Sequence, residues 1–110
     1  MKTTKFFITV LFTFVFSVAT FAQSSMKTDT IKVSGNCSSC EARIEKATKI
    51  PGVTKADWST KTKLLVVTYD SKKTSNDAIQ KKVASVGHDT PKYKADKKVY
   101  DALPGCCKYR

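Results

Sequence analysis

The sequence predicts one small α+β domain, an antiparallel four-stranded sheet with two helices on one face. Three observations support this class. Several short segments alternate apolar and polar residues as strands do, and two longer segments repeat apolar residues at helical spacing. Glycine and proline residues separate these segments. We therefore expect strand, helix, strand, strand, helix and strand, in that order, followed by a short C-terminal extension over residues 95–110.

The first 22 residues have the pattern of a secretory signal peptide. A basic start containing Lys2 and Lys5 precedes an uncharged apolar run over residues 6–16, and small residues lead up to Ala22. The apolar run is too short to cross a bilayer as a helix, so we expect no transmembrane segment in the mature chain. Removal of residues 1–22, which contain Lys2 and Lys5 and no acidic residue, lowers the formal net charge from +11 to +9. The protein is expected to be exported, either periplasmic or secreted.

The first strand is expected after a flexible lead-in over residues 23–29, which are polar. Residues 30–34 alternate, with Ile31 and Val33 on one face. Gly35 and its neighbour then break the strand.

The first helix has a clear start signal. Ser38 with Glu41 three residues later forms a capping-box pattern, which predicts Ser38 as N-cap and places Cys40 in the first turn. Ile44 continues the apolar face of this helix. The helix must end before Pro51.

The next two strands are expected at residues 53–59 and 63–70. Trp58 is assigned to the core side of the first. The second has the strongest strand pattern in the chain, with one predicted core face and one outer face. The core-side residues are Leu65, Val67 and Tyr69, and the outer residues are Leu64, Val66 and Thr68.

The second helix is expected to begin within residues 74–77 and to end at Gly87. A brief edge strand is predicted over residues 90–94, although Pro91 weakens it. A short third helix is expected within residues 96–103. With these elements the order becomes βαββαβ, the split βαβ sandwich of ferredoxin type.

The chain has four cysteines in two close pairs, Cys37 with Cys40 and Cys106 with Cys107. Such close pairs cross-link a fold poorly, because short loops constrain the unfolded chain least. A thiol at a helix start loses its proton readily, and thiolates select Cu(I), Zn(II) and similar ions over Mg²⁺ or Ca²⁺. A soft-metal site at Cys37 and Cys40 is therefore predicted. A thiol-disulfide exchange protein, or a basic interaction module with structural disulfides, is the alternative.

The chain from about residue 30 to residue 94 resembles the heavy-metal-associated domain family, which includes copper chaperones and a periplasmic mercury-binding protein. The resemblance is carried by the sequences over residues 35–40, 50–53, 67–70 and 87–88. It implies that Cys37 and Cys40 bind one thiophilic ion and pass it to partners by ligand exchange. Cu(I) is the expected cargo, with Hg(II) or Zn(II) as alternatives, and no catalytic turnover is expected.

Two positions depart from the family pattern. Gly35 stands where the family usually has a methionine that packs beneath the metal loop, and His88 stands where many members have tyrosine or phenylalanine. His88 is thus a candidate third ligand or pH-sensitive neighbour, beside the alternative of a non-ligating loop histidine. Cys106 and Cys107 are candidate additional ligands. The alternative is that these two cysteines are oxidised, or exposed in the tail, and do not bind the ion.

The excess of basic residues favours an acidic partner. The lysines are scattered and lack the aromatic-and-basic pattern of RNA-binding motifs, so no nucleic-acid binding is expected. The expected partner is a metal-transport protein with an acidic docking surface. The protein is expected to act as a monomer, with a metal-bridged dimer as the alternative.

Overall fold

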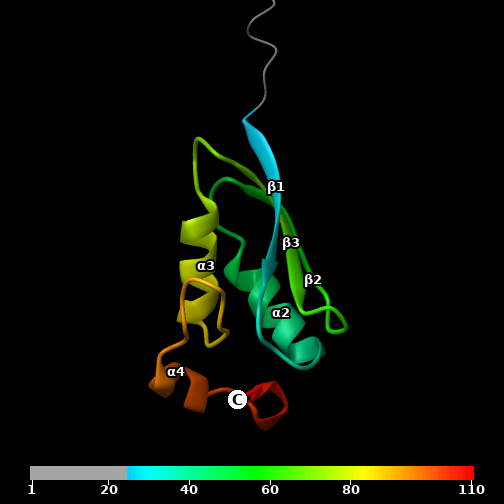
Figure 1. Ribbon diagram of the computed structural model, residues 1–110, viewed down its shortest axis with the longest axis vertical. Coiled ribbons are helices and arrows are strands. Elements are labelled where there is room, and N and C mark those ends of the chain that lie inside the picture. Colours follow the sequence, from blue (N-terminus) through cyan, green and yellow to red (C-terminus); the bar gives the residue numbers. More distant parts are fainter. Residues whose placement is uncertain (1–24) are drawn as a thin grey trace, which may run out of the picture.

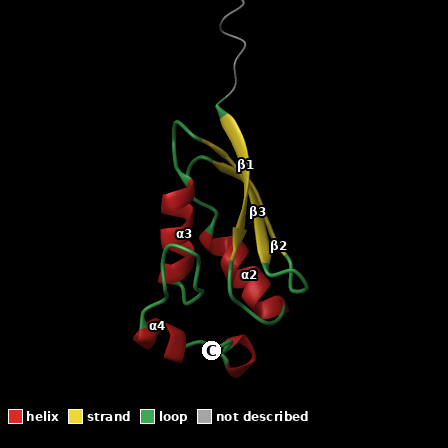
Figure 2. Cartoon of the chain, in the orientation of Figure 1, coloured by secondary structure: helices red, strands yellow, loops and turns green. Residues whose placement is uncertain are grey.

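The structure is a computed structural model that describes residues 25–110, so the expected signal peptide lies outside the described residues. Strands β1, β3 and β2 form an antiparallel sheet in that order, and α2 and α3 lie together on one of its faces (Figures 1 and 2). This confirms the α+β, ferredoxin-like class. The elements are β1 (Met26–Lys32), α2 (Ser38–Ala47), β2 (Val53–Trp58), β3 (Leu64–Asp70), α3 (Asn76–Ser85), α4 (Lys97–Asp101) and a 3-10 turn (Gly105–Cys107).

Strand β3 is central and follows the predicted alternation. Leu65, Val67 and Tyr69 are buried against the helices, whereas Leu64 and Val66 are exposed on the outer face. Neighbouring residues of a strand point to opposite faces, so this pattern sets which side of the sheet forms the core.

Strand β1 begins four residues earlier than expected, at Met26, so the prediction of a flexible segment is wrong for residues 26–29. These residues pair with the end of β3, Met26 opposite Asp70. Asp29 also accepts hydrogen bonds from the Tyr69 hydroxyl at 2.6 Å and from Asn76 Nδ2 at 3.0 Å. These polar residues therefore extend the strand because they have partners on β3 and at the start of α3.

The expected N-cap at Ser38 is wrong by one position. Ser38 is the first helical residue, and Cys37 is the N-cap, with extended backbone angles and no side-chain capping bond. The Cys37 carbonyl instead accepts the N–H groups of Cys40 at 2.9 Å and Glu41 at 3.1 Å. The first thiol therefore lies at the helix boundary.

The expected fourth strand over residues 90–94 is not formed. The chain passes beside the end of β1, where Ser34 N–H donates to the Asp89 carbonyl at 3.0 Å, and then turns away. Thr90 N–H donates to the Tyr93 carbonyl at 2.8 Å, which closes a local turn around Pro91. A proline has no N–H to donate to a sheet, so this segment folds as a loop.

The C-terminal extension folds back onto the domain. Helix α4 forms within the expected residues 96–103, and Gly87 ends the α3 region with a φ of +110°. Leu103 packs so closely that a Cβ on Gly87 would lie 2.9 Å from its Cδ2. The final residues then reach the end of the domain where the β1–α2 loop lies (Figure 1).

Within residues 25–110, no helix has both the length and the apolar character needed to cross a bilayer.

Candidate metal centre

Cys37 and Cys40 lie at the start of α2. Cys37 is half-buried and Cys40 is fully buried. Their Sγ atoms are 3.8 Å apart, and the Asn36 N–H approaches the Cys40 sulfur at 3.3 Å. The structure thus brings together the two thiols that the sequence singled out.

A third sulfur joins this pair from the C-terminal tail. Cys107 is fully buried, and its Sγ lies 3.9 Å from Cys37 Sγ. The sulfurs of Cys37, Cys40 and Cys107 all lie within 4.8 Å of one another. In the described part of the chain, this is the group of histidine, cysteine or acidic residues with the geometry to hold a metal ion.

The two tail cysteines have different environments. Cys106 is exposed, and its Sγ lies 4.0 Å from that of Cys107. It is not part of the three-sulfur group. All four cysteines are free thiols in the structure.

The thiols of the group differ in acidity. Hydrogen bonding with the Cys106 thiol, followed by the Cys40 backbone N–H, lowers the pKa of Cys37 to about 6. Cys37 is therefore mostly thiolate at neutral pH. Burial raises the pKa of Cys107 to about 12. Cys107 retains its proton in the free protein, and any metal bound by its sulfur must displace that proton.

Arg43 contacts the tail thiol, a contact that no pattern in the sequence indicates. Arg43 lies one turn after Cys40 on α2, and its guanidinium NH1 approaches Cys107 Sγ at 3.2 Å. This places a permanent positive charge against the sulfur group. Helical spacing from Cys40 is enough to place Arg43 near the metal loop. Its contact with Cys107 depends on how the C-terminal tail folds back, which the sequence does not show.

His88 is fully buried beside the loop but is not in the three-sulfur group. Its Nδ1 lies 2.8 Å from the Ser34 carbonyl, which can only accept, so Nδ1 carries the hydrogen. Its Nε2 has no hydrogen-bond partner among the described residues. Burial lowers the pKa of His88, which keeps the ring neutral at neutral pH. The ring stacks against Tyr109 of the tail, with centroids 5.8 Å apart.

Trp58 occupies the space beside Gly35. A Cβ on Gly35 would lie 3.0 Å from two indole carbons and 3.2 Å from the Cys40 Cβ. The indole Nε1–H donates to the Val33 carbonyl at 3.0 Å, which fixes the ring beneath the loop. A side chain larger than glycine at position 35 would therefore collide with the Trp58 ring from β2 unless that ring moved.

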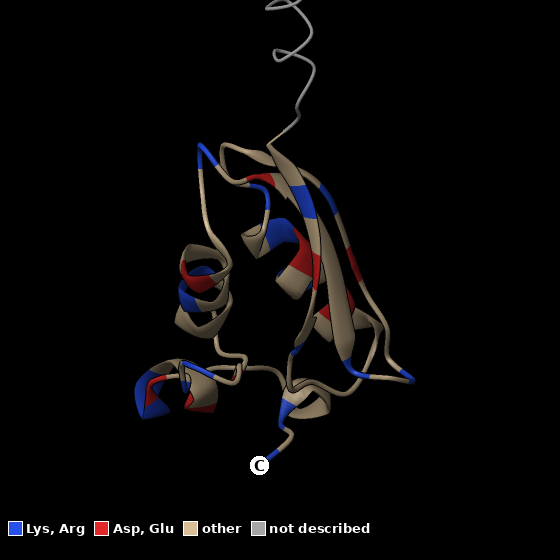
Figure 3. Ribbon diagram, turned by 45° about the horizontal axis from the view of Figure 1, so that its top comes forward, with Lys and Arg blue, Asp and Glu red and all other residues tan. Residues whose placement is uncertain are grey.

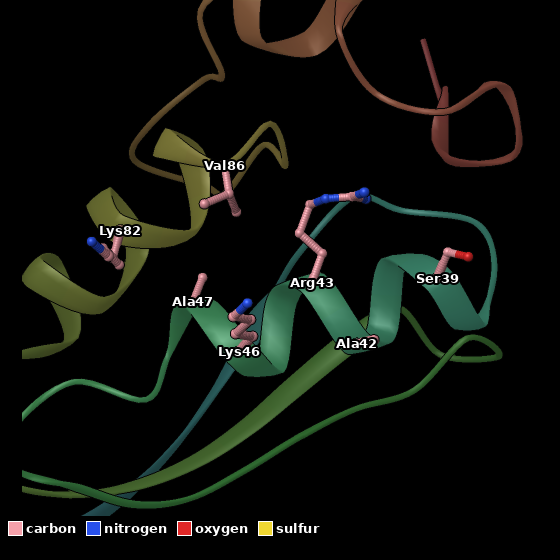
Figure 4. Close-up of a pocket in the computed structure, with 7 residues that line it drawn as sticks. All are labelled: Ser39, Ala42, Arg43, Lys46, Ala47, Lys82 and Val86. Atoms are coloured by element: carbon pink, nitrogen blue, oxygen red, sulfur yellow. The ribbon is translucent and has the colours of Figure 1, made fainter.

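A groove of about 600 Å³ lies between α2 and α3, next to the metal loop (Figure 4). Lys and Arg residues are spread over helices, strands and turns (Figure 3). The groove itself nevertheless contains Arg43, Lys46 and Lys82 and no acidic residue. The full lining consists of Ser39, Ala42, Arg43, Lys46, Ala47, Lys82 and Val86.

Comparisons with known proteins agree with this site. The chain is 40% identical over 75 residues to a copper-exporting P-type ATPase of Bacillus subtilis, a match that covers 66% of this chain but 9% of the ATPase. It is 39% identical over 69 residues to the periplasmic component of a mercuric transport protein of Shewanella putrefaciens, covering 61% of this chain and 76% of that protein. Among solved structures, a CopZ metallochaperone superposes with a TM-score of 0.56 at 27% identity, over 58% of this chain and 98% of the other.

The family model described as the heavy-metal-associated domain matches residues 30–89, which include Cys37, Cys40 and His88 but end before the tail cysteines. The fold, the paired thiols at the start of α2 and this match agree, and the chain therefore belongs to the heavy-metal-associated domain family.

Proposed function

We propose that this protein binds one soft metal ion, Cu(I) as the principal cargo, through Cys37 and Cys40. The observation that carries the proposal is the convergence of two thiols 3.8 Å apart at a helix start, with the pKa of Cys37 lowered to about 6. Thiolates are the ligands that soft ions prefer. The relatives named for copper and mercury transport support metal trafficking or scavenging.

Cu(I) is favoured over Zn(II) by the number of donors. Structural Zn(II) sites are almost always four-coordinate. Cys37 and Cys40 supply two sulfurs, and even the whole group that the structure brings together has only three, with Cys106 and His88 outside it. Hg(II) has the same preference for sulfur and remains the alternative cargo.

A competition titration tests the proposal. The reduced wild-type protein is titrated with Cu(I) in the presence of a chromophoric Cu(I) chelator, beside the same protein with its thiols alkylated. We expect the reduced protein to withdraw one Cu(I) per chain from the chelator and the alkylated protein to withdraw none. Equal behaviour of the two samples would contradict metal binding, and insulin reduction by the same sample would favour thiol-disulfide exchange instead.

We place this activity outside the cytoplasm. The basic and apolar pattern of residues 1–22 is that of a signal peptide, and one relative is named as a periplasmic component. Sequencing of the exported protein is expected to start at Gln23. Recovery of the intact chain from the cytoplasm would contradict this location.

The groove between α2 and α3 is the proposed docking surface for an acidic partner. Arg43, Lys46 and Lys82 place three positive charges along the groove, and Ser39 of the metal loop lines it too, so an acidic segment bound there would bring a partner's ligands close to the ion.

Charge reversal in the groove tests this docking surface. The probe is a fluorescent polyglutamate peptide, and the variant pair is Lys46→Glu with Lys82→Glu. The matched control is Lys61→Glu with Lys72→Glu, which has the same net charge at exposed turns. We expect the groove variant to weaken binding several-fold more than the control, most clearly at low salt. Equal losses would mean that net charge alone attracts the peptide.

A further inference from the structure

We propose that Cys107 is a third thiolate ligand and that residues 105–110 form a strap that closes the metal loop. Cys106 remains outside the coordination sphere. This inference rests on the proposed function, since it concerns the same ion. The family match ends at residue 89, so the strap is a feature of this chain beyond the matched domain.

The sulfur spacings fit three ligands better than two. With metal–sulfur bonds of about 2.3 Å, two sulfurs on opposite sides of an ion lie about 4.6 Å apart, and three in a plane around it lie about 4.0 Å apart. Cys37 Sγ lies 3.8 Å from Cys40 Sγ and 3.9 Å from Cys107 Sγ, and the third pair, Cys40 with Cys107, lies within 4.8 Å. An ion at the centre of the three sulfurs would therefore reach all of them without a large movement of the loop.

The strap is held to the loops on both sides of the site. The Asn36 side-chain amide donates to the Lys108 carbonyl at 2.8 Å. The Tyr109 hydroxyl donates to the Gly87 carbonyl at 2.6 Å and accepts the Asp89 N–H at 2.9 Å. These bonds hold the two residues that follow Cys107, so its sulfur is positioned before any ion binds, and the ordering cost of a third ligand is already met by folding.

The charge around Cys107 also suits a ligand. Three thiolates around one Cu(I) carry a net charge of −2, which is costly to bury without a compensating cation. Arg43 lies 3.2 Å from Cys107 Sγ and supplies a charge that is never lost by deprotonation.

Further support comes from the separation of the two tail thiols. Cys107 is fully buried within the group, whereas Cys106 is exposed. Cys107→Ser and Cys106→Ser therefore change the same atom at adjacent positions. The number of sulfurs bound to the ion distinguishes them, whereas affinity alone does not, because the Cys106 thiol also lowers the pKa of Cys37.

The test counts the sulfurs bound to the ion. X-ray absorption spectra of the Cu(I)-loaded protein are recorded for wild type, Cys107→Ser and Cys106→Ser, beside the chelator titration. We expect three sulfurs for wild type and Cys106→Ser, and two for Cys107→Ser. Loss of the third thiolate should weaken Cu(I) affinity by about ten- to a hundredfold, since even outer-shell partners usually contribute this much.

Several results would overturn the inference. These are two sulfurs in the wild type, equal affinity for wild type and Cys107→Ser, or a metal-bridged dimer in which a second chain supplies the third sulfur. The wild-type spectrum needs no substitution, so the inference stays testable if Cys107→Ser folds poorly. If the wild type binds no Cu(I), the proposed function itself fails. If it binds Cu(I) through two sulfurs, only the strap inference fails.

Discussion

The double variant Cys37→Ser, Cys40→Ser is expected to lose Cu(I) binding almost completely. Four-ligand zinc sites in small domains bind with roughly 10–16 kcal/mol, or about 3 kcal/mol per ligand, so loss of two thiolates is expected to reduce affinity by at least about a thousandfold. A serine hydroxyl is a hard donor and does not replace a thiolate for a soft ion.

The chelator titration measures this loss, and Lys61→Glu with Lys72→Glu is the control because both lysines lie at exposed turns and outside the three-sulfur group. Unfolding of the metal-free double variant is measured alongside, to show that the fold is retained. Cu(I) affinity within tenfold of the wild type would show that the ion binds elsewhere.

Replacing Trp58 by alanine is expected to lower the free energy of unfolding by about 3–5 kcal/mol, the usual range for a buried tryptophan. Trp58 is 2% exposed, and its indole packs against Gly35 and donates to the Val33 carbonyl. The truncation removes both the packing and the partner of a buried carbonyl. A small domain has only about 5–15 kcal/mol of stability in total, so this is a large share.

Denaturant unfolding followed by far-ultraviolet circular dichroism measures this effect, because the variant has lost the chain's one tryptophan. Trp58→Phe is the matched control, since it keeps a ring beneath the loop but removes the indole N–H. We expect it to lie between wild type and Trp58→Ala. A Trp58→Ala variant as stable as the wild type would show that the indole does not support the loop.

The helix start shows where local patterns mislead. Ser38 and Glu41 have the spacing of a capping box, yet Cys37 is the N-cap. The pattern identifies a helix start correctly but cannot choose between adjacent residues, because that choice depends on how the preceding loop leaves β1. A similar limit applies to residues 26–29, whose strand conformation comes from partners on β3 and α3 that are about 40 residues or more away.

The sequence by itself determined the order of the main elements, the core face of β3, and Cys37 and Cys40 as the central thiols. Each of these depends on residues close together in the chain, where strand or helix periodicity and the spacing of two cysteines are directly visible. Only the tertiary structure decided that Cys107 and not Cys106 joins the pair, that Arg43 contacts that thiol, and that Trp58 occupies the space beside Gly35. Cys107 lies 70 positions after Cys37, and contacts over such distances arise from how the tail packs against two loops, which no local pattern records.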